Sequence, residues 1–242
     1  MYKKLICLSF SLIFAGQFTY GQMMGSGNSL DFDGVDDYVN LNSHFTNLTV
    51  PFTIAAWIKP AQASLNQTIF YSHGHGNSYV GGWLQYRNGK LAVGYGDGTV
   101  RNSSGRRVAQ ATVAYNSNQW VHVAGVVRGP TDMDIYVNGN SQTVSYNGSG
   151  GSMVTNTATG WIGGYIYNNA TDYYAGEIEE LSLWNSALTA TDVRDLMCSK
   201  LTGNEPSLIA YYDFDSNTGS NLNNLVANGI DGTLQNNPTW VG

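Results

Sequence analysis

The sequence predicts an all-β fold: an antiparallel jelly-roll sandwich of two sheets with one short helix near residues 189–198. Three observations predict it. Most of the chain divides into short runs rich in β-branched and aromatic residues, separated by Gly, Asn, Asp or Ser. Two of those separators contain Asn-Gly, which favours tight hairpin turns. One segment near the carboxyl end has the i, i+3, i+4 apolar spacing of a helix.

The first residues have the layout of a signal peptide. Lys3 and Lys4 precede an apolar run over residues 5–14, and small and polar residues follow it. That run is too short to remain as a membrane-spanning helix. We therefore expect residues 1–21 to be removed on export, leaving one domain over residues 22–242 of a secreted or cell-surface protein.

The net charge bounds the partners of this domain. The leader carries two lysines and no acid, so its removal lowers the formal charge from −6 to −8. Nucleic-acid binding rests on clustered basic residues, and an acidic surface with scattered Lys and Arg excludes it. The same charge disfavours anionic membranes, and we expect no membrane insertion.

Cysteine usage indicates that the domain relies on its core. Cys7 lies in the apolar run of the leader, so Cys198 is the only cysteine of the expected mature chain. We therefore expect no intrachain disulfide and a packed thiol at Cys198. About 220 residues suffice for one large β domain with its own core.

The strand segments follow one another along the first two thirds of the chain. They are FTIAAWIKP (52–60), TIFYSHG (68–74), WLQYRNGKLAVGY (83–95), WVHVAGVVRG (120–129) and MDIYVNGNSQTVSY (133–146). The third segment contains Asn88-Gly89 and the fifth contains Asn138-Gly139. Asn and Gly tolerate the positive φ of a two-residue hairpin turn, so both segments are predicted hairpins.

The helix is predicted from its cap and its apolar stripe. Thr189 caps the first turn, and Asp192 stands three residues later, at capping-box spacing. Val193, Leu196 and Met197 then form the apolar stripe. The helix therefore packs on the side of the sandwich.

Several motifs in order carry a family resemblance. They are LDFDGVDDYV (30–39), FTIAAWIKP, WVHVAGVV with MDIYVNG, AGEIEELSLWNSALTATDVRDLM (175–197) and IAYYDFD (209–215). Together they resemble the concanavalin A-like jelly roll of the laminin G-like and pentraxin type, over residues 29–241. The resemblance implies bent sheets whose concave face and loop rim bind glycans, often with calcium. Its members include lectins, adhesion modules and domains appended to enzymes, so the fold alone does not assign a function.

Glycoside hydrolysis is tested by a carboxylate pattern. Hydrolases of this fold carry Glu-x-Asp-x-x-Glu on one strand, which aims the acid and the nucleophile into one cleft. The nearest match here is Glu177-x-Glu179-x-x-Ser182, which lacks the acid/base residue. We therefore expect the protein not to be an enzyme and assign no catalytic residue.

Four aspartates in LDFDGVDDYVNL raise the question of a metal. Gly34 allows a tight turn that brings Asp36 and Asp37 near Asp33, and calcium takes six to eight oxygen ligands. We expect the termini to meet in a fold of this type, so that one of three distant acids completes the site: Glu179, Asp213 or Asp215. Calcium is the only cofactor considered. The alternative is an Asx-type turn in which Asp33 accepts hydrogen bonds from backbone amides.

Candidate ligand-binding residues lie in the predicted loop rim. In pentraxins, acids and amides of the matching loops hold a ligand calcium ion, and the residues that correspond here are Asn77, Asn169 and Asp172, without the acid-rich run of that family. Four aromatics of the same rim are candidates for stacking on sugar rings: Tyr79, Trp83, Tyr165 and Tyr167. The alternative is that alternating aromatics of a sandwich fill its core.

The sequence thus predicts a secreted, non-catalytic binding module that recognises a glycan or a cell-surface partner, stabilised by at most one calcium ion. The alternative is a protein-interaction or structural domain of an adhesin or surface assembly, without a sugar site. Glycoside hydrolysis is the third hypothesis. A domain of this kind is also expected as part of a larger surface protein.

Overall fold

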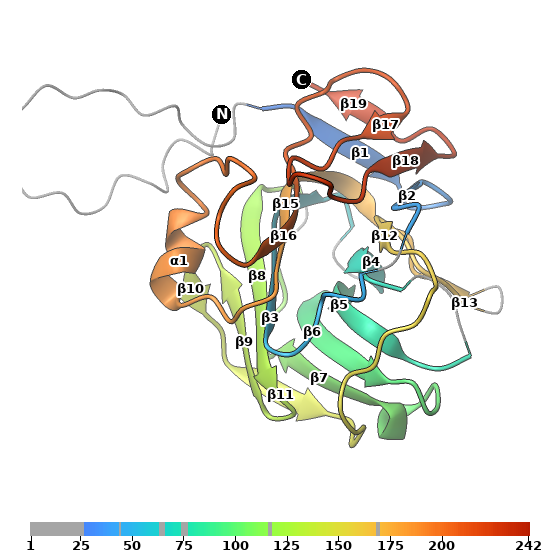
Figure 1. Ribbon diagram of the computed structural model, residues 1–242, viewed down its shortest axis with the longest axis vertical. Helices are drawn as coiled ribbons and strands as arrows, with labels where there is room; N and C mark the ends of the chain where they lie inside the picture. Colours follow the sequence, from blue (N-terminus) through green and yellow to red (C-terminus); the bar gives the residue numbers. More distant parts are fainter. Residues whose placement is uncertain (1–26, 44, 63–65, 74–76, 116–117, 168–169) are drawn as a thin grey trace, which may run out of the picture.

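The computed structural model describes residues 27–43, 45–62, 66–73, 77–115, 118–167 and 170–242. Two antiparallel sheets pack against each other, with one short helix on the side (Figure 1). The predicted all-β sandwich is therefore confirmed. In the described part of the chain, no helix has the length and apolar character needed to cross a membrane. The predicted signal peptide lies outside the described residues.

The first sheet has eight strands and contains the first and the last strand of the described chain. Its order is β10 (Asn140–Ser141), β9 (Asp132–Val137), β8 (Val121–Gly129), β3 (Phe52–Pro60), β15 (Ala175–Trp184), β1 (Ser29–Asp33) and β19 (Thr239–Val241), and β16 (Leu208–Tyr212) also pairs with β15. Leu30 of β1 pairs with Ile178 on one side and with Trp240 on the other. The termini of the domain therefore meet in one sheet, as the sequence predicted.

The second sheet has nine strands. Its order is β11 (Val144–Asn147), β7 (Arg106–Ala111), β6 (Lys90–Asp97), β5 (Val80–Arg87), β4 (Gln67–Tyr71), β12 (Trp161–Ile162), β2 (Tyr38–Asn40), β18 (Gly232–Gln235) and β17 (Asn221–Leu222). A separate pair is formed by β13 (Ile166–Tyr167) and β14 (Ala170–Thr171), and a 3₁₀ turn, η2 (Ser103–Gly105), precedes β7.

Both predicted hairpins form through their Asn-Gly turns. Asn88 and Gly89 have φ of 51° and 75° between β5 and β6, and Asn138 and Gly139 have φ of 47° and 71° between β9 and β10. Positive φ at both central residues gives the turn a twist that matches the strands it joins. The register of each hairpin therefore follows from its turn.

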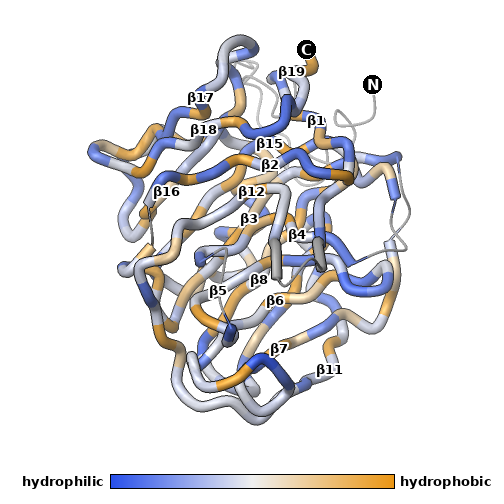
Figure 2. Tube along the Cα trace, turned by 90° about the vertical axis from the view of Figure 1, so that its right-hand side faces the viewer, coloured by the Kyte–Doolittle hydropathy of each residue, from blue (hydrophilic) through white to orange (hydrophobic). Residues whose placement is uncertain are grey.

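The core lies between the two sheets. Ile54 and Ile58 of β3 alternate toward it, and they meet Leu84 of β5 and Val93 of β6, all without solvent exposure. Figure 2 shows hydrophobic stretches along β3, β5, β6 and β8. Burying each such side chain contributes about 1.5–3 kcal/mol. Because inward and outward positions alternate, the residues between them face away from the core.

The helix α1 (Ala190–Asp195) has the predicted cap. Asp192 N–H donates to Thr189 Oγ1 at 3.2 Å, and Thr189 N–H donates to the Asp192 carboxylate at 2.8 Å. Val193 is fully buried in a cluster with Ala55 and Ala124. These alanines are on the outer face of the eight-stranded sheet, so α1 covers that face.

The expectation for Cys198 is wrong for this structure. The structure has Cys198 disulfide-bonded, whereas the sequence predicted a lone thiol. The chain contains one other cysteine, Cys7, which lies outside the described residues.

Candidate functional site

A row of aromatic side chains crosses the outer face of the nine-stranded sheet. Phe70 and Leu84 belong to the core, so their neighbours Tyr71 and Trp83 point away from it. Trp161 pairs with Tyr71 across β12 and β4, and Tyr71 pairs with Trp83 across β4 and β5. Three neighbouring strands therefore place their large aromatics side by side on one face.

Further tyrosines pack against this row, Tyr38 from the adjacent strand β2 and the others from segments outside the sheet. Tyr38 stacks on Trp161 with ring centroids 4.1 Å apart, and Tyr165 stacks on Tyr71 at 4.5 Å. Tyr79 lies over Trp83, tilted, at 5.6 Å. Trp83 is 1% exposed, whereas Tyr38 and Tyr79 are half-buried. Trp83 and Tyr165 (3% exposed) are thus the floor of the platform, and Tyr38 and Tyr79 meet the solvent.

One glycine of β6 lets the Tyr79 segment approach the sheet. A Cβ on Gly96 would lie 2.1 Å from the carbonyl oxygen of Tyr79. The backbone of Tyr79 is held by a hydrogen bond from Gly98 N–H to its carbonyl at 2.8 Å. The outward position at Gly96 of β6 is therefore small because the Tyr79 segment lies directly on it.

A small recess opens within the aromatic group. About 40 Å³ is free inside it, and its lining is Tyr71, Tyr79, Trp83, Gln85, Arg87, Arg101, Tyr165 and Asp172. Arg101 lies 5.0 Å from the Tyr79 centroid and 4.6 Å from that of Tyr165, a cation–π arrangement. Arg106 donates to the hydroxyl of Tyr79 at 2.6 Å. Guanidinium groups therefore stand over the aromatic faces.

Asp172 is held at this recess by its backbone. Its N–H donates to the carbonyl of Tyr165 at 3.0 Å, and its own carbonyl accepts from Thr68 N–H at 2.9 Å. Burial raises the pKa of Asp172 above its ordinary value, although the charges of Arg87 and Arg101 act in the opposite direction.

The structure brings together four of the seven predicted ligand-binding residues. These four, Tyr79, Trp83, Tyr165 and Asp172, all line the recess. Asn77 is exposed and is not part of the lining. The backbone of Tyr167 belongs to β13, but its side chain lies outside the described part, as does Asn169.

Sequence reasoning missed several members of the site: Tyr38, Tyr71, Trp161, Arg101 and Arg106. Alternation around Tyr71 and Tyr38 was visible in the sequence and signalled that one residue in two faces outward. The pairing of β12 with both β4 and β2 was not visible, because β12 has only two residues.

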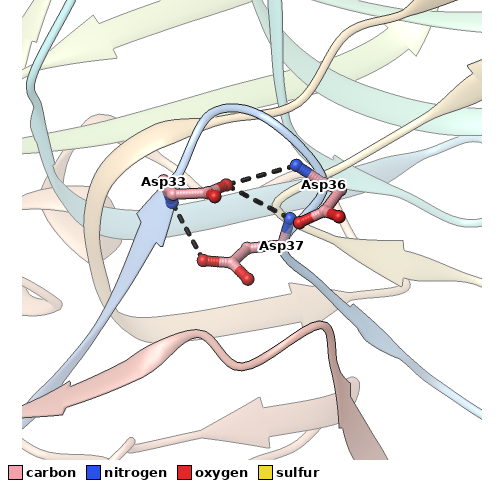
Figure 3. Close-up of side chains that lie close together, drawn as sticks. All are labelled: Asp33, Asp36 and Asp37. Atoms are coloured by element: carbon pink, nitrogen blue, oxygen red, sulfur yellow. Dashed lines mark hydrogen bonds between the residues drawn. The ribbon is translucent and has the colours of Figure 1, made fainter.

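The turn at Asp33 is built as an Asx turn. Asp33 Oδ1 accepts N–H groups of Val35, Asp36 and Asp37 at 2.8, 3.2 and 3.3 Å. In return, Asp33 N–H donates to Asp37 Oδ2 at 3.0 Å (Figure 3). Burial alone would raise the pKa of Asp33, but these hydrogen bonds outweigh it and lower the pKa. Burial raises the pKa of Asp37 to about 6, with the charges of Asp33 and Asp36 acting in the same direction.

The same turn is the candidate metal site. Among the described residues, Asp33, Asp36 and Asp37 form the one group with ligand atoms all within 4.8 Å of one another. Two of their oxygens already accept amide hydrogens, so three carboxylates alone fall short of the six to eight oxygens of calcium. Glu179 and Asp213 do not join the group: Asp33 pairs with Ala175, four residues before Glu179, about 13 Å along β15.

The carboxylates of the hydrolase-like pattern lie on the opposite side of the sandwich. Ile178 faces the core, so Glu177 and Glu179 face outward from the eight-stranded sheet. Glu177 accepts from Lys59 Nζ at 2.5 Å and from Ser29 Oγ at 2.7 Å, and Ser182 Oγ accepts from the indole N–H of Trp184 at 3.1 Å. These groups are engaged in structural contacts, far from the aromatic recess.

Glu180 has an unusual environment for a structural reason. It sits in a bulge of β15 at φ 53°, and its side chain accepts a hydrogen bond from Tyr211 and lies 3.5 Å from Lys200 Nζ. Burial raises the pKa of Glu180 to about 7, although Tyr211 and Lys200 act to lower it. The cluster ties the segment that follows α1 to the sheet.

Another cavity, of about 630 Å³, lies at one end of the sandwich between β6, β7 and the end of β8. Its two arginines are already engaged. Arg128 forms ion pairs with Asp132 at 3.0 Å and Asp134 at 2.5 Å, and Arg107 donates to two backbone carbonyls, at 2.6 and 3.1 Å. Two buried donors without a partner in the described part of the chain, the indole N–H of Trp83 and the Nε–H of Arg106, lie at or beside the aromatic recess instead.

Comparisons with known proteins agree on the fold. A protein from Bacteroides ovatus, provisionally described as carbohydrate-binding, is 20% identical with a TM-score of 0.64; the match covers 88% of this chain and 59% of that one. The CBM40 domain of a Ruminococcus gnavus IT-sialidase, solved with α2,3-sialyllactose, is 12% identical with a TM-score of 0.52, over 71% of this chain and 96% of that one. No curated protein matches the chain significantly.

The family model confirms the resemblance inferred from the motifs. The laminin G model described as the concanavalin A-like lectin/glucanases superfamily matches residues 33–194, more than half of the chain. The matched range runs from the Asx turn to the capped helix and includes the aromatic row. The chain therefore belongs to the concanavalin A-like lectin/glucanases superfamily.

Proposed function

We propose that the protein is a non-catalytic glycan-binding module, and that its binding face is the outer face of the nine-stranded sheet. The observation that carries the proposal is the group of packed aromatics on this face, where Tyr38 of β2 and Tyr79 are half-buried and Tyr79 lines the recess with its polar groups. Sugar rings place their C–H faces on such aromatic surfaces, while neighbouring side chains hydrogen-bond the hydroxyls.

Two further features support a glycan over a protein partner. The exposed large hydrophobic residues are scattered along the described chain, at positions such as Val35, Val113 and Leu225. A large contiguous apolar patch would favour a protein partner, and the exposed hydrophobic residues of the described chain include no run of sequence neighbours. The descriptions of the two structural relatives as carbohydrate-binding point in the same direction.

Two features support a role without catalysis. The outward carboxylates of β15 are ion-paired or buried, and they lie on the sheet opposite the aromatic group. Retaining glycosidases need two carboxyl groups about 5 Å apart that face the bound sugar. The recess has a single carboxylate among its described lining residues, that of Asp172.

We also propose export, on the basis of the leader-like segment at residues 1–21.

A glycan array followed by calorimetry with the best ligand tests this function. We expect Tyr38→Ala and Tyr79→Ala each to weaken binding about tenfold, since each removes a stacking contact of about 1–1.5 kcal/mol. Tyr146→Ala is the matched control, because Tyr146 is a 43% exposed tyrosine on the edge strand β11. Equal affinity of all three variants and the wild type would place the glycan elsewhere, and an array without any bound glycan would reject the function.

A further inference from the structure

Positive charge converges on the aromatic recess of an otherwise acidic protein. The chain has a net charge of −6 and six arginines, of which Arg87, Arg101 and Arg106 stand at this recess. They come from β5, from the segment before η2 and from β7, so the fold brings them together from three elements. Asp172 is the one carboxylate among the described lining residues, which leaves a formal charge of +2.

Two of these arginines form no salt bridge within the described part of the chain, although the charge of Asp172 acts on Arg87. Neither Arg87 nor Arg106 forms a salt bridge with any carboxylate of the described residues, whereas Arg128 on the other sheet has two. Burial lowers the pKa of Arg87, and the charge of Arg106 acts in the same direction. Unpaired guanidinium groups packed together at a partly buried site are costly, and an anion among them would remove that cost.

Two buried hydrogen-bond donors at the recess have no acceptor within the described part of the chain. The indole N–H of Trp83 and the Nε–H of Arg106 are buried and have no hydrogen-bond partner within the described part of the chain. Arg106 uses its other nitrogens on the Tyr79 hydroxyl at 2.6 Å and on Asn147 Oδ1 at 3.3 Å. A buried donor without a partner costs about 1–3 kcal/mol, so these groups favour a ligand rich in acceptor oxygens.

The size of the recess limits what enters it. Its free volume of about 40 Å³ is too small for a sugar ring. A cavity needs about 10–15 Å³ of such space to hold one water molecule, so the recess suits one small polar group. Carboxylate and sulfate groups have this size, carry only acceptor oxygens, and match the planar fork of arginine.

We propose that this recess receives the carboxylate or sulfate group of an acidic glycan, while the rest of the saccharide lies along the half-exposed tyrosines of the same face. The inference rests on the proposed glycan-binding function and adds the charge of the ligand to it. The neutral hydroxyls of a saccharide need no such excess of cationic donors. The arginines therefore select acidic saccharides over neutral ones.

Matched pairs of saccharides test the proposal. An array carries uronate- and sialate-bearing saccharides beside their methyl esters, and sulfated saccharides beside their unsulfated parents, and the pair with signal is measured by calorimetry. We expect the acidic member to bind at least about tenfold more tightly, and 0.5 M salt to reduce that difference. The two kinds of pair distinguish a carboxylate from a sulfate.

Three variants test whether the preference for acidic saccharides originates at the recess. Arg87→Gln should weaken binding of the acidic member about tenfold and leave the neutral member unchanged, because only the charged contact is lost. Asp172→Asn should strengthen binding of the acidic member, a gain that misfolding does not produce. Arg194→Gln on α1 is the control, since it changes the net charge equally on the other sheet.

Each of the other outcomes contradicts a different part of the proposal. Equal affinity for both members of every pair rejects charge selection and leaves the glycan-binding function standing. Equal losses in Arg87→Gln and Arg194→Gln show an effect of net charge alone and reject the recess as its origin. If no member of any pair binds, the glycan-binding function itself is rejected, and the inference falls with it.

Discussion

Glu180 offers the sharpest test of how the structure controls the protein's pH response. The substitution Glu180→Gln removes its charge and keeps an oxygen that accepts from the Tyr211 hydroxyl. Burial raises the pKa of Glu180 from 4.5 to about 7. Between these values the folded protein holds a proton that the unfolded chain has released, so the wild type loses stability as the pH rises.

The magnitude follows from the size of the shift. A change of about 2.5 pKa units corresponds to about 3 kcal/mol at 1.36 kcal/mol per unit, fully lost above the folded pKa. Gln carries no charge at any pH, so the free energy of unfolding of Glu180→Gln should rise relative to that of the wild type by up to about 3 kcal/mol between pH 4.5 and 8. In a domain of about 220 residues this is about 6–12 °C in melting temperature.

Urea unfolding followed by tryptophan fluorescence at pH 5, 6, 7 and 8 measures the difference. Glu205→Gln is the control: hydrogen bonds from Thr202 and Gly203 outweigh the effect of burial and lower the pKa of Glu205. Its titration therefore falls below pH 5, and its difference from the wild type should stay constant over the series. Parallel pH profiles of Glu180→Gln and the wild type would refute the reasoning that burial governs this carboxyl.

Two further predictions concern the Asx turn and the aromatic face. Calcium binding at the turn is a proposal, and it predicts that EDTA lowers the melting temperature of the wild type. EDTA should not lower that of Asp36→Ala, because this variant loses a calcium ligand and keeps the turn. An unchanged wild-type melting curve in EDTA would contradict calcium binding. Gly96→Ala should destabilise the fold by more than about 2 kcal/mol in urea unfolding, because its Cβ would lie 2.1 Å from the Tyr79 carbonyl. The matched Gly129→Ala, whose Cβ has its nearest neighbour at 4.0 Å, should change stability by less than about 1 kcal/mol; equal losses would show that close packing of Tyr79 is not the cause.

Local chemistry explains which features were predictable. The capping box at Thr189 and the Asn-Gly hairpins depend on residues a few positions apart, so spacing alone predicts them. The amide contacts of Asp33 are equally local, and they favour the Asx interpretation of a cluster that also suggested a metal. Whether Glu179 lies near the Asp33 turn depends on the register between β1 and β15. That register separates Glu179 from the turn.

The aromatic site shows where local patterns stop. Alternation indicates that Trp83 faces away from the core, but it does not tell whether solvent or another segment meets it. Tyr79 lies over Trp83 because Gly96 of β6 leaves room for that segment. The predicted stacking residue is consequently a floor, and the exposed role passes to Tyr79 and Tyr38.

By itself, the sequence determined the all-β class, the hairpins, the capped helix and the superfamily, because period-two patterns and turn residues act over a few positions. The tertiary structure alone decided which aromatics are exposed and which arginines converge on them. Arg87, Arg101 and Arg106 come from separate elements, and Tyr38 and Trp161 are more than a hundred residues apart. Only the pairing of distant strands brings such residues together, because the charge and the surface of a binding face are sums over segments that the chain leaves far apart.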